Sequence, residues 1–153
     1  MAKVKKLKEL KEIIRKLKKN GRKIVFTNGC FDLLHPGHIK VFLEAKQKGD
    51  ILVVGVNSDS SIKKIKGLNR PILNEKARLQ ILEHLDLIDY IVVFPETTPY
   101  KAIQGIKPQV LVKGGDWSKK NIVGRDLVDK VYRVKLKKGY STTAIIKAIR
   151  ECC

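Results

Sequence analysis

The sequence has 153 residues, 43% of them hydrophobic and 31% charged, which is enough chain for a buried core and excludes a disordered, collagen-like or low-complexity protein. Its 33 lysines and arginines exceed its 15 acidic residues by 18, an excess that favours partners carrying phosphate groups. The longest apolar runs, residues 51–56 and 91–94, are far shorter than the roughly 20 residues of a membrane span, and the first apolar segment is too short for a secretory signal, so we expect a cytoplasmic protein without a membrane partner.

The first 23 residues hold half of the excess charge, because eleven lysines and arginines and two glutamates give a net of +9. Apolar residues recur here at spacings of three, four and three, which predicts an amphipathic helix that ends near Asn20. They are Leu7, Leu10, Ile14 and Leu17. We therefore divide the chain into a basic N-terminal helix, residues 1–21, and a main domain, residues 22–153.

The apolar face of this helix is expected to pack on the main domain or on a second subunit. Its basic face leaves open a contact with nucleic acid or an anionic membrane. No aromatic residue interleaves the lysines, so the stacking surface typical of single-strand binding is missing, and we expect no nucleic-acid partner.

From residue 22 onward, short β-branched runs alternate with amphipathic stretches, a pattern typical of βαβ units around a parallel sheet. The expected strands are residues 23–27, 51–56, 90–94, 110–112 and 131–134. The expected helices are residues 36–48, 74–85, 99–106 and 142–150. The sequence thus predicts one α/β domain with a doubly wound, five-stranded parallel sheet. Such sheets bind ligands beyond the carboxyl ends of their strands.

The segment after the first expected strand, Gly29-Cys-Phe-Asp-Leu-Leu-His35-Pro-Gly-His38, indicates phosphate binding. It places a glycine turn, a carboxylate and two histidines where the next helix begins, and Pro36 suits the first helical position. Unpaired N–H groups and the helix dipole make such a position a good anion site. Neither GxGxxG nor GxxxxGK[ST] is present, so a different phosphate-binding design is expected.

A histidine pair also occurs in metal sites, but these need a third protein ligand. The remaining histidine, His84, lies far along the chain, and Cys30, Cys152 and Cys153 show no CxxC or CxxH spacing. We therefore expect neither a protein-bound metal nor a disulfide framework.

The loop resembles the signature of the HxGH nucleotidyltransferase superfamily, which implies a Rossmann-like fold. Ser141-Thr142-Thr143, at the start of the last expected helix, resembles a second motif of the same superfamily. Residues 22–150 as a whole resemble the adenylyltransferase domain that makes ADP-heptose, which is commonly fused behind a sugar kinase. The resemblance rests on residues 26–32, 56–59 with 63–67, 70–71, 112–116 and 141–147. The kinase half is missing, so we expect a stand-alone version.

The resemblance implies that AMP is transferred from ATP to D-glycero-D-manno-heptose 1-phosphate, with release of pyrophosphate, for lipopolysaccharide precursors. It assigns catalytic roles to His35, His38 and Lys64, and substrate binding to Asp32 and Arg78. It assigns nucleotide binding to Cys30, Phe31, Gly37, Lys66, Lys113, Asp116, Ser141, Thr142 and Thr143. Lys64 and Lys66 are expected in a loop after the second strand. Magnesium would be held mainly by phosphate oxygens, and a homodimer is expected because the superfamily is often dimeric.

Other functions stay open at this stage. Glycerol 3-phosphate cytidylyltransferases share the HxGH loop, a Gly-Asp-Trp sequence like residues 115–117, and the Ser-Thr-Thr sequence, so only resemblance selects adenine over cytosine. A basic nucleic-acid-binding module and a nucleotide-binding regulator without turnover are the alternatives from other classes. By themselves, Ser141 to Thr143 are also typical of a simple helix cap, and Lys63 to Lys66 of a solvated loop.

Overall fold

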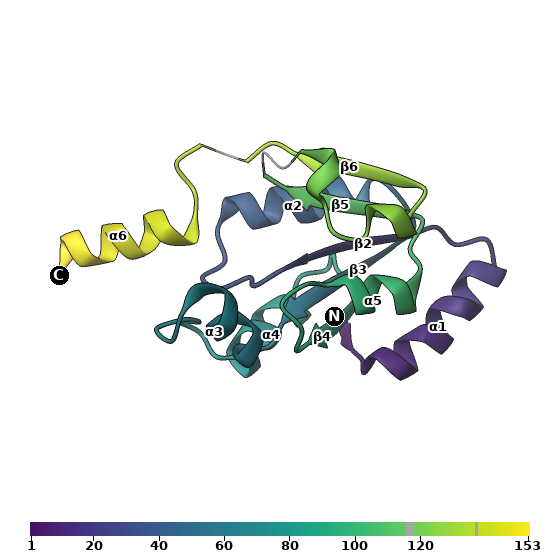
Figure 1. The fold of residues 1–153 in the computed structure, drawn as a ribbon, viewed down its shortest axis with the longest axis horizontal. Coiled ribbons are helices and arrows are strands. Elements are labelled where there is room, and N and C mark those ends of the chain that lie inside the picture. Colours follow the sequence, from purple (N-terminus) through teal and green to yellow (C-terminus); the bar gives the residue numbers. More distant parts are fainter. Residues whose placement is uncertain (116–117, 137) are drawn as a thin grey trace.

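The computed structural model describes residues 1–115, 118–136 and 138–153. In these residues six parallel strands form one sheet in the order β1-β4-β3-β2-β5-β6 (Figure 1). The strands are β1 (Lys3–Val4), β2 (Ile24–Gly29), β3 (Ile51–Asn57), β4 (Tyr90–Phe94), β5 (Val110–Gly114) and β6 (Lys130–Val134). The helices are α1 (Leu7–Lys19), α2 (Pro36–Lys46), α3 (Asp59–Lys66), α4 (Glu75–Glu83), α5 (Tyr100–Ile106) and α6 (Thr142–Cys152), with 3₁₀ turns at Lys119–Asn121 and Arg125–Leu127.

The predicted doubly wound parallel α/β fold is confirmed, but the sheet has six strands rather than five. The five expected strands correspond to β2 to β6. The additional strand, β1, is only two residues long and pairs with the edge of β4, where the backbone N–H of Lys5 donates to the carbonyl of Ile91. Two residues joined mainly through the backbone carry no alternating pattern, so this strand was not predicted.

Helix α3 replaces the loop that we expected around Lys64 and Lys66. It begins where the Ser58 side chain accepts a hydrogen bond from the backbone N–H of Ser61 at 3.1 Å, and it ends at Gly67, which has a φ of 94°. In eight residues only Ser61 and Ile62 are buried, so the helical period is too short to be recognised in the sequence.

The sheet separates two apolar clusters. Helices α2 and α4 cover one face, where Val25 of β2 packs with Phe42 and Leu82. Helices α1 and α5 cover the other face, where Ile24 and Phe26 pack with Ile103 and Ile106. Neighbouring residues of β2 therefore face opposite layers, as the pleat of a strand requires. Helix α6 extends away from this body, and none of its residues is buried (Figure 1).

The apolar stripe of α1 packs on the main domain. Leu10 and Ile14 are fully buried against β2, β4 and α5, and the ends of the stripe, Leu7 and Leu17, are partly buried in the same cluster. The Lys18 side chain adds a bond to the carbonyl of Lys107 at the end of α5. The division of the chain at residue 21 stays a prediction. No helix in the described part of the chain is both long and apolar enough to cross a membrane.

The strand order reverses at β2, which has β3 on one side and β5 on the other. Beyond the carboxyl ends of β2 and β5, the connections leave the sheet in opposite directions and open a crevice. Gly29 ends β2 and Gly114 ends β5, so the HxGH loop begins at this crevice.

Candidate functional site

His35 forms the N-cap of α2. Its ring Nδ1 accepts a hydrogen bond from the backbone N–H of Gly37 at 3.1 Å, and Pro36 occupies the first turn without an N–H to satisfy. A neutral ring that accepts at Nδ1 carries its proton on Nε2, which leaves an N–H to donate. A side chain at position 37 would lie 2.8 Å from Cε1 of His35, so glycine is needed at that position.

His38 stacks on His35, with ring centroids 3.8 Å apart. The rings of His38 and Phe31 pack in a T-shaped arrangement, with centroids 5.3 Å apart. Burial lowers the pKa of His38 to about 4, and the charges of His35 and Lys66 act in the same direction. The ring is therefore neutral at pH 7. Its Nδ1 is buried and has no hydrogen-bond partner among the described residues, although buried polar atoms are normally paired.

The two histidines line a cavity of about 250 Å³, which we call the histidine cavity. Its wall is built from the end of β2, the start of α2, the end of β5 and the residues before α6. Six of the predicted site residues line it, namely Phe31, His35, Gly37, His38, Lys113 and Ser141. Residues from four separate segments thus meet at the crevice beside β2.

A second cavity of about 370 Å³ adjoins the first, and we call it the threonine cavity because Thr97 and Thr98 line it. The two cavities share Asn28, Gly29 and Lys113. Burial lowers the pKa of the Lys113 ammonium group below its usual value. The predicted residues Cys30 and Lys66 line this second cavity, so the structure divides the predicted nucleotide set between two neighbouring spaces.

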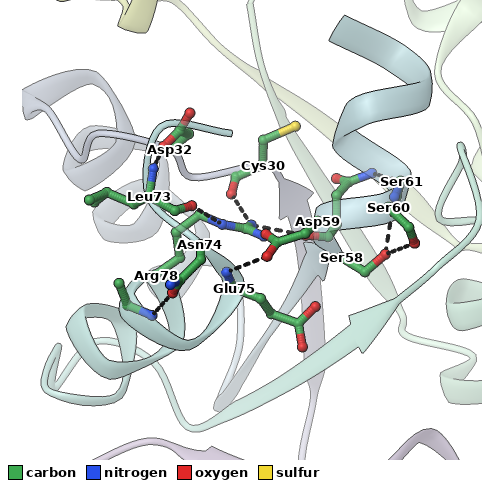
Figure 2. Close-up of polar contacts among 12 residues, drawn as sticks. Cys30, Asp32, Ser58, Asp59, Ser60, Ser61, Leu73, Asn74, Glu75 and Arg78 are labelled. Carbon is green, nitrogen blue, oxygen red and sulfur yellow. Dashed lines mark hydrogen bonds and ion pairs between the residues drawn. The ribbon is translucent and has the colours of Figure 1, made fainter. Parts of the chain in front are cut away.

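Arg78 does not reach either cavity. Its side chain is 1% exposed, and its guanidinium donates to the carbonyls of Cys30 at 2.6 Å, Asn57 at 2.9 Å and Leu73 at 3.1 Å (Figure 2). The remaining nitrogen, Nη2, donates to Oδ1 of Asp59 at 2.8 Å. Arg78 therefore ties the ends of β2 and β3 to the start of α3.

Asp59, the partner of Arg78, is held ionised by its surroundings. Burial alone would raise the pKa of this carboxyl, but the backbone N–H of Glu75 and the guanidinium of Arg78 together lower the pKa below its usual value. The carboxylate of Asp59 accepts the Glu75 N–H at 3.0 Å (Figure 2), so it also fastens the start of α4 to the start of α3.

Asp32 also joins separate segments of the chain through hydrogen bonds. It is 1% exposed, and its carboxylate accepts the backbone N–H groups of Ile72 at 2.7 Å and Leu73 at 2.9 Å, together with Nε of Arg70 at 3.1 Å. Its backbone carbonyl accepts the Thr142 hydroxyl at 2.9 Å. Asp32 and Arg78, both predicted to bind substrate, therefore have protein groups as partners and line neither cavity.

The last helix contributes differently from the prediction. Tyr140 and Ser141 line the histidine cavity, whereas the Thr142 hydroxyl is bonded to Asp32. Thr143 faces a separate depression that it shares with Arg70 and other residues. Neither of the two threonines that the resemblance assigns to nucleotide binding lines the histidine cavity.

The remaining predicted site residues are Lys64 and Asp116. Lys64 is exposed on α3 and lines neither cavity, while Lys66 does line one. Asp116 lies outside the described residues.

Sequence reasoning missed Asn28, Thr97, Thr98, Asn121 and Tyr140, all of which line one or both cavities. A signal existed for the two threonines, because they follow β4 and the carboxyl ends of parallel strands meet at one edge of the sheet. Nothing in the local pattern distinguishes Asn121 or Tyr140 from other polar loop residues.

Comparison with known sequences gives consistent results. A family model described as cytidylyltransferase-like matches residues 26–148. The chain is 51% identical over 148 residues to the bifunctional protein HldE of Aliarcobacter butzleri, a match that covers 97% of this chain and 31% of that protein. It is 50% identical over 142 residues to HldE of Helicobacter pylori, covering 93% and 31%. The chain thus spans less than a third of the length of these relatives.

Two solved structures share the fold. The lipopolysaccharide core biosynthesis protein from Thermoplasma volcanium superposes with a TM-score of 0.66 at 29% identity, over 77% of this chain and 100% of that chain. Pantoate-beta-alanine ligase from Francisella tularensis gives a TM-score of 0.71 over 97% of this chain and 73% of that one, but at 18% identity this likeness concerns the fold alone. Because the family model covers most of the chain and includes the histidine loop, the protein belongs to the cytidylyltransferase-like family.

Proposed function

We propose that this nucleotidyltransferase moves AMP from ATP to D-glycero-D-manno-heptose 1-phosphate and so produces ADP-heptose and pyrophosphate. The observation that carries the proposal is the histidine pair at the start of α2, which lines a cavity with a buried nitrogen that has no partner among the described residues. The choice of sugar is supported by the resemblance of residues 22–150 to the ADP-heptose-forming domain. The similar protein from Thermoplasma volcanium bears a name from lipopolysaccharide core biosynthesis.

In this reaction an oxygen of the sugar phosphate attacks the α-phosphorus of ATP. The bond from the α-phosphorus to the bridging oxygen breaks, and pyrophosphate leaves with the electron pair of that bond. The protein's task is to position two anions and to stabilise charge that builds on the leaving group. No covalent intermediate on the enzyme is required.

We assign the triphosphate to the histidine cavity. The start of α2 offers backbone N–H groups and the positive end of a helix dipole, and Nε2 of His35 has an N–H to donate. A phosphate oxygen beside His38 would favour the protonated imidazole, which its present surroundings disfavour. Lys113 adds a cation between the two cavities.

Magnesium is proposed to enter as part of the substrate, bound to the phosphates of ATP and to water. Among the described residues, no group of three His, Cys, Asp or Glu side chains is arranged to hold a metal ion. The chain's own contribution is therefore the cationic and N–H groups around the phosphates. The ion itself would neutralise phosphate charge.

The test crosses ATP and CTP, each with magnesium, against heptose 1-phosphate and glycerol 3-phosphate. Pyrophosphate release and product mass are measured. We expect turnover with ATP and heptose 1-phosphate, whereas a preference for CTP and glycerol 3-phosphate would identify a cytidylyltransferase instead. His38→Asn should lower kcat by about 10²- to 10⁴-fold. His84→Asn is the matched control, because His84 caps the end of α4 and should turn over like the wild type.

We also propose that the protein is a homodimer in which α6 packs on a second copy. Helix α6 has no buried residue, Ile149 on it is 52% exposed, and Leu43 on the outer side of α2 is 45% exposed. Sedimentation should give twice the chain mass of 17.3 kDa for the wild type and a single chain mass for Ile149→Glu. A wild type that sediments as a monomer at micromolar concentration contradicts the dimer.

A further inference from the structure

The threonine cavity is separate from the space that the histidines line, yet the two are joined. Asn28, Gly29 and Lys113 belong to both walls, so a ligand in one cavity lies directly beside a ligand in the other. A transfer between two substrates needs this arrangement, because the attacking oxygen must lie about 3 Å from the phosphorus that it attacks. The volume of about 370 Å³ falls in the ordinary range for small-molecule sites.

The wall of the threonine cavity carries two chemically different kinds of polar side chain. Two cations, Lys66 and Lys113, line it, and Lys113 also borders the histidine cavity. The wall also offers the neutral hydrogen-bonding side chains of Thr97, Thr98 and Asn121. Apolar side chains such as Ile122 complete the lining, and no acidic residue lines the cavity in the described part of the chain.

This arrangement matches a ligand with one anionic end and a neutral body rich in hydroxyl groups. A phosphate pairs with ammonium groups, while hydroxyl and amide side chains exchange hydrogen bonds with sugar hydroxyls. The charge of Lys66 also lowers the pKa of the His38 ring, so Lys66 lies near the histidine pair. A phosphate held there would face the reacting end of the nucleotide.

We infer that the threonine cavity binds the acceptor, with its phosphate at Lys66 and Lys113 and its sugar hydroxyls at Thr97, Thr98 and Asn121. The inference rests on the proposed function and assigns its second substrate to particular residues. It also makes the two threonines determinants of specificity, because they would contact the part of the acceptor that differs between a sugar phosphate and a shorter polyol phosphate.

The experiment measures binding by calorimetry, separately from turnover. Heptose 1-phosphate, glycerol 3-phosphate and a non-hydrolysable ATP analogue are titrated into the wild type, Lys66→Met and the double variant Thr97→Val/Thr98→Val. Lys63→Met is the matched control, because Lys63 is exposed on the same helix and lines neither cavity. Thr97 and Thr98 are exposed, so their replacement by valine should leave the fold intact, which the urea midpoint checks.

Lys66→Met should weaken both acceptors by about 10- to 100-fold, since a hydrogen bond to a charged group is lost. The double threonine variant should weaken heptose 1-phosphate by roughly 10-fold and glycerol 3-phosphate much less. The Kd of the ATP analogue should stay within about twofold in the threonine variant, and Lys63→Met should behave as the wild type.

Two results would overturn the inference. One is a threonine variant that loses affinity for the ATP analogue and keeps affinity for the acceptors, since the cavity would then hold the nucleoside. The other is unchanged or absent acceptor binding throughout the series. Failure of the proposed function looks different: the acceptors bind and respond to Lys66→Met as expected, but the wild type releases no pyrophosphate from ATP.

Discussion

Two sets of polar side chains lie at the carboxyl ends of the strands, and they differ in how completely they are hydrogen-bonded. All three nitrogens of Arg78 donate within the protein, and both carboxylate oxygens of Asp32 accept. By contrast, His38 keeps a buried Nδ1 without a partner in the described part of the chain, and His35 uses only one ring nitrogen in its cap. Both sets belong to the same edge of the sheet.

The difference separates residues that build the site from residues that meet the ligand. A buried charge is tolerated when every polar atom has a partner, and such a network fixes the segments that it joins. A buried polar atom without a partner lowers the stability of the protein without ligand. A ligand that supplies the missing hydrogen bond recovers that free energy on binding. Residue type alone does not make this distinction, because arginine and aspartate are also common phosphate and magnesium ligands.

Among these polar residues, we expect replacement of Arg78 to lower the free energy of unfolding the most. Arg78→Met removes the guanidinium, so Oδ1 of Asp59 and three carbonyls lose the hydrogen bonds that Arg78 donates. We expect the free energy of unfolding in urea to fall by about 3–5 kcal/mol. Arg78→Lys keeps the charge but not the five-donor fork, so its loss should be smaller and still measurable.

The same pair of variants tests whether Arg78 belongs to the scaffold or contacts the ligand. If Arg78 contacted the sugar phosphate, Arg78→Met would raise the KM for the acceptor and change the unfolding free energy by less than about 1 kcal/mol, as exposed substitutions do. A large stability loss in Arg78→Met, with an intermediate loss in Arg78→Lys, assigns the residue to the scaffold. Measuring both quantities on each variant keeps the outcome clear.

Most of the fold could be predicted because its signals are local. Buried parallel strands are β-branched runs such as residues 51–56, and Pro36 marks the start of α2. The stripe of α1 shows the helical period over three turns. Strand β1 could not be predicted because it is held by backbone pairing with β4, and α3 because eight residues with few buried side chains carry almost no period.

The candidate site was predictable in part. His35, Gly37 and His38 lie in one short segment, so their meeting follows from the start of a single helix. The partners of Arg78 are backbone carbonyls at Cys30, Asn57 and Leu73, and no sequence pattern marks a carbonyl. The path of the chain before α6 decides which side chains near this helix line the histidine cavity. Tyr140 and Ser141 line it, whereas Thr143 does not.

The pH dependence of stability tests the state of the His38 ring, and its expected effect is smaller than that of Arg78→Met. The pKa of His38 is about 4 in the folded protein, against 6.5 for an ordinary histidine. Between these pH values the unfolded chain binds more protons than the folded one, so the folded state loses stability as the pH falls. Above pH 6.5 the free energy of unfolding is not reduced by protonation of His38. Near pH 4 this protonation lowers the free energy of unfolding by about 3 kcal/mol.

Urea unfolding from pH 7.5 to pH 4 measures this loss, and His38→Asn isolates it. Carboxylates such as Asp59, whose pKa is lowered, add a slope of the same sign in both proteins. The difference between wild type and variant therefore belongs to His38 and to its charge coupling with His35, whose pKa burial also lowers. His84→Asn should keep the wild-type slope. Superimposable curves for wild type and His38→Asn would mean that the ring binds protons as readily in the folded protein as in the unfolded chain. The buried, unsatisfied imidazole would then have no part in the site. Pyrophosphate at saturating concentration should flatten the wild-type slope alone, because an anion beside the ring raises its pKa towards that of the unfolded chain.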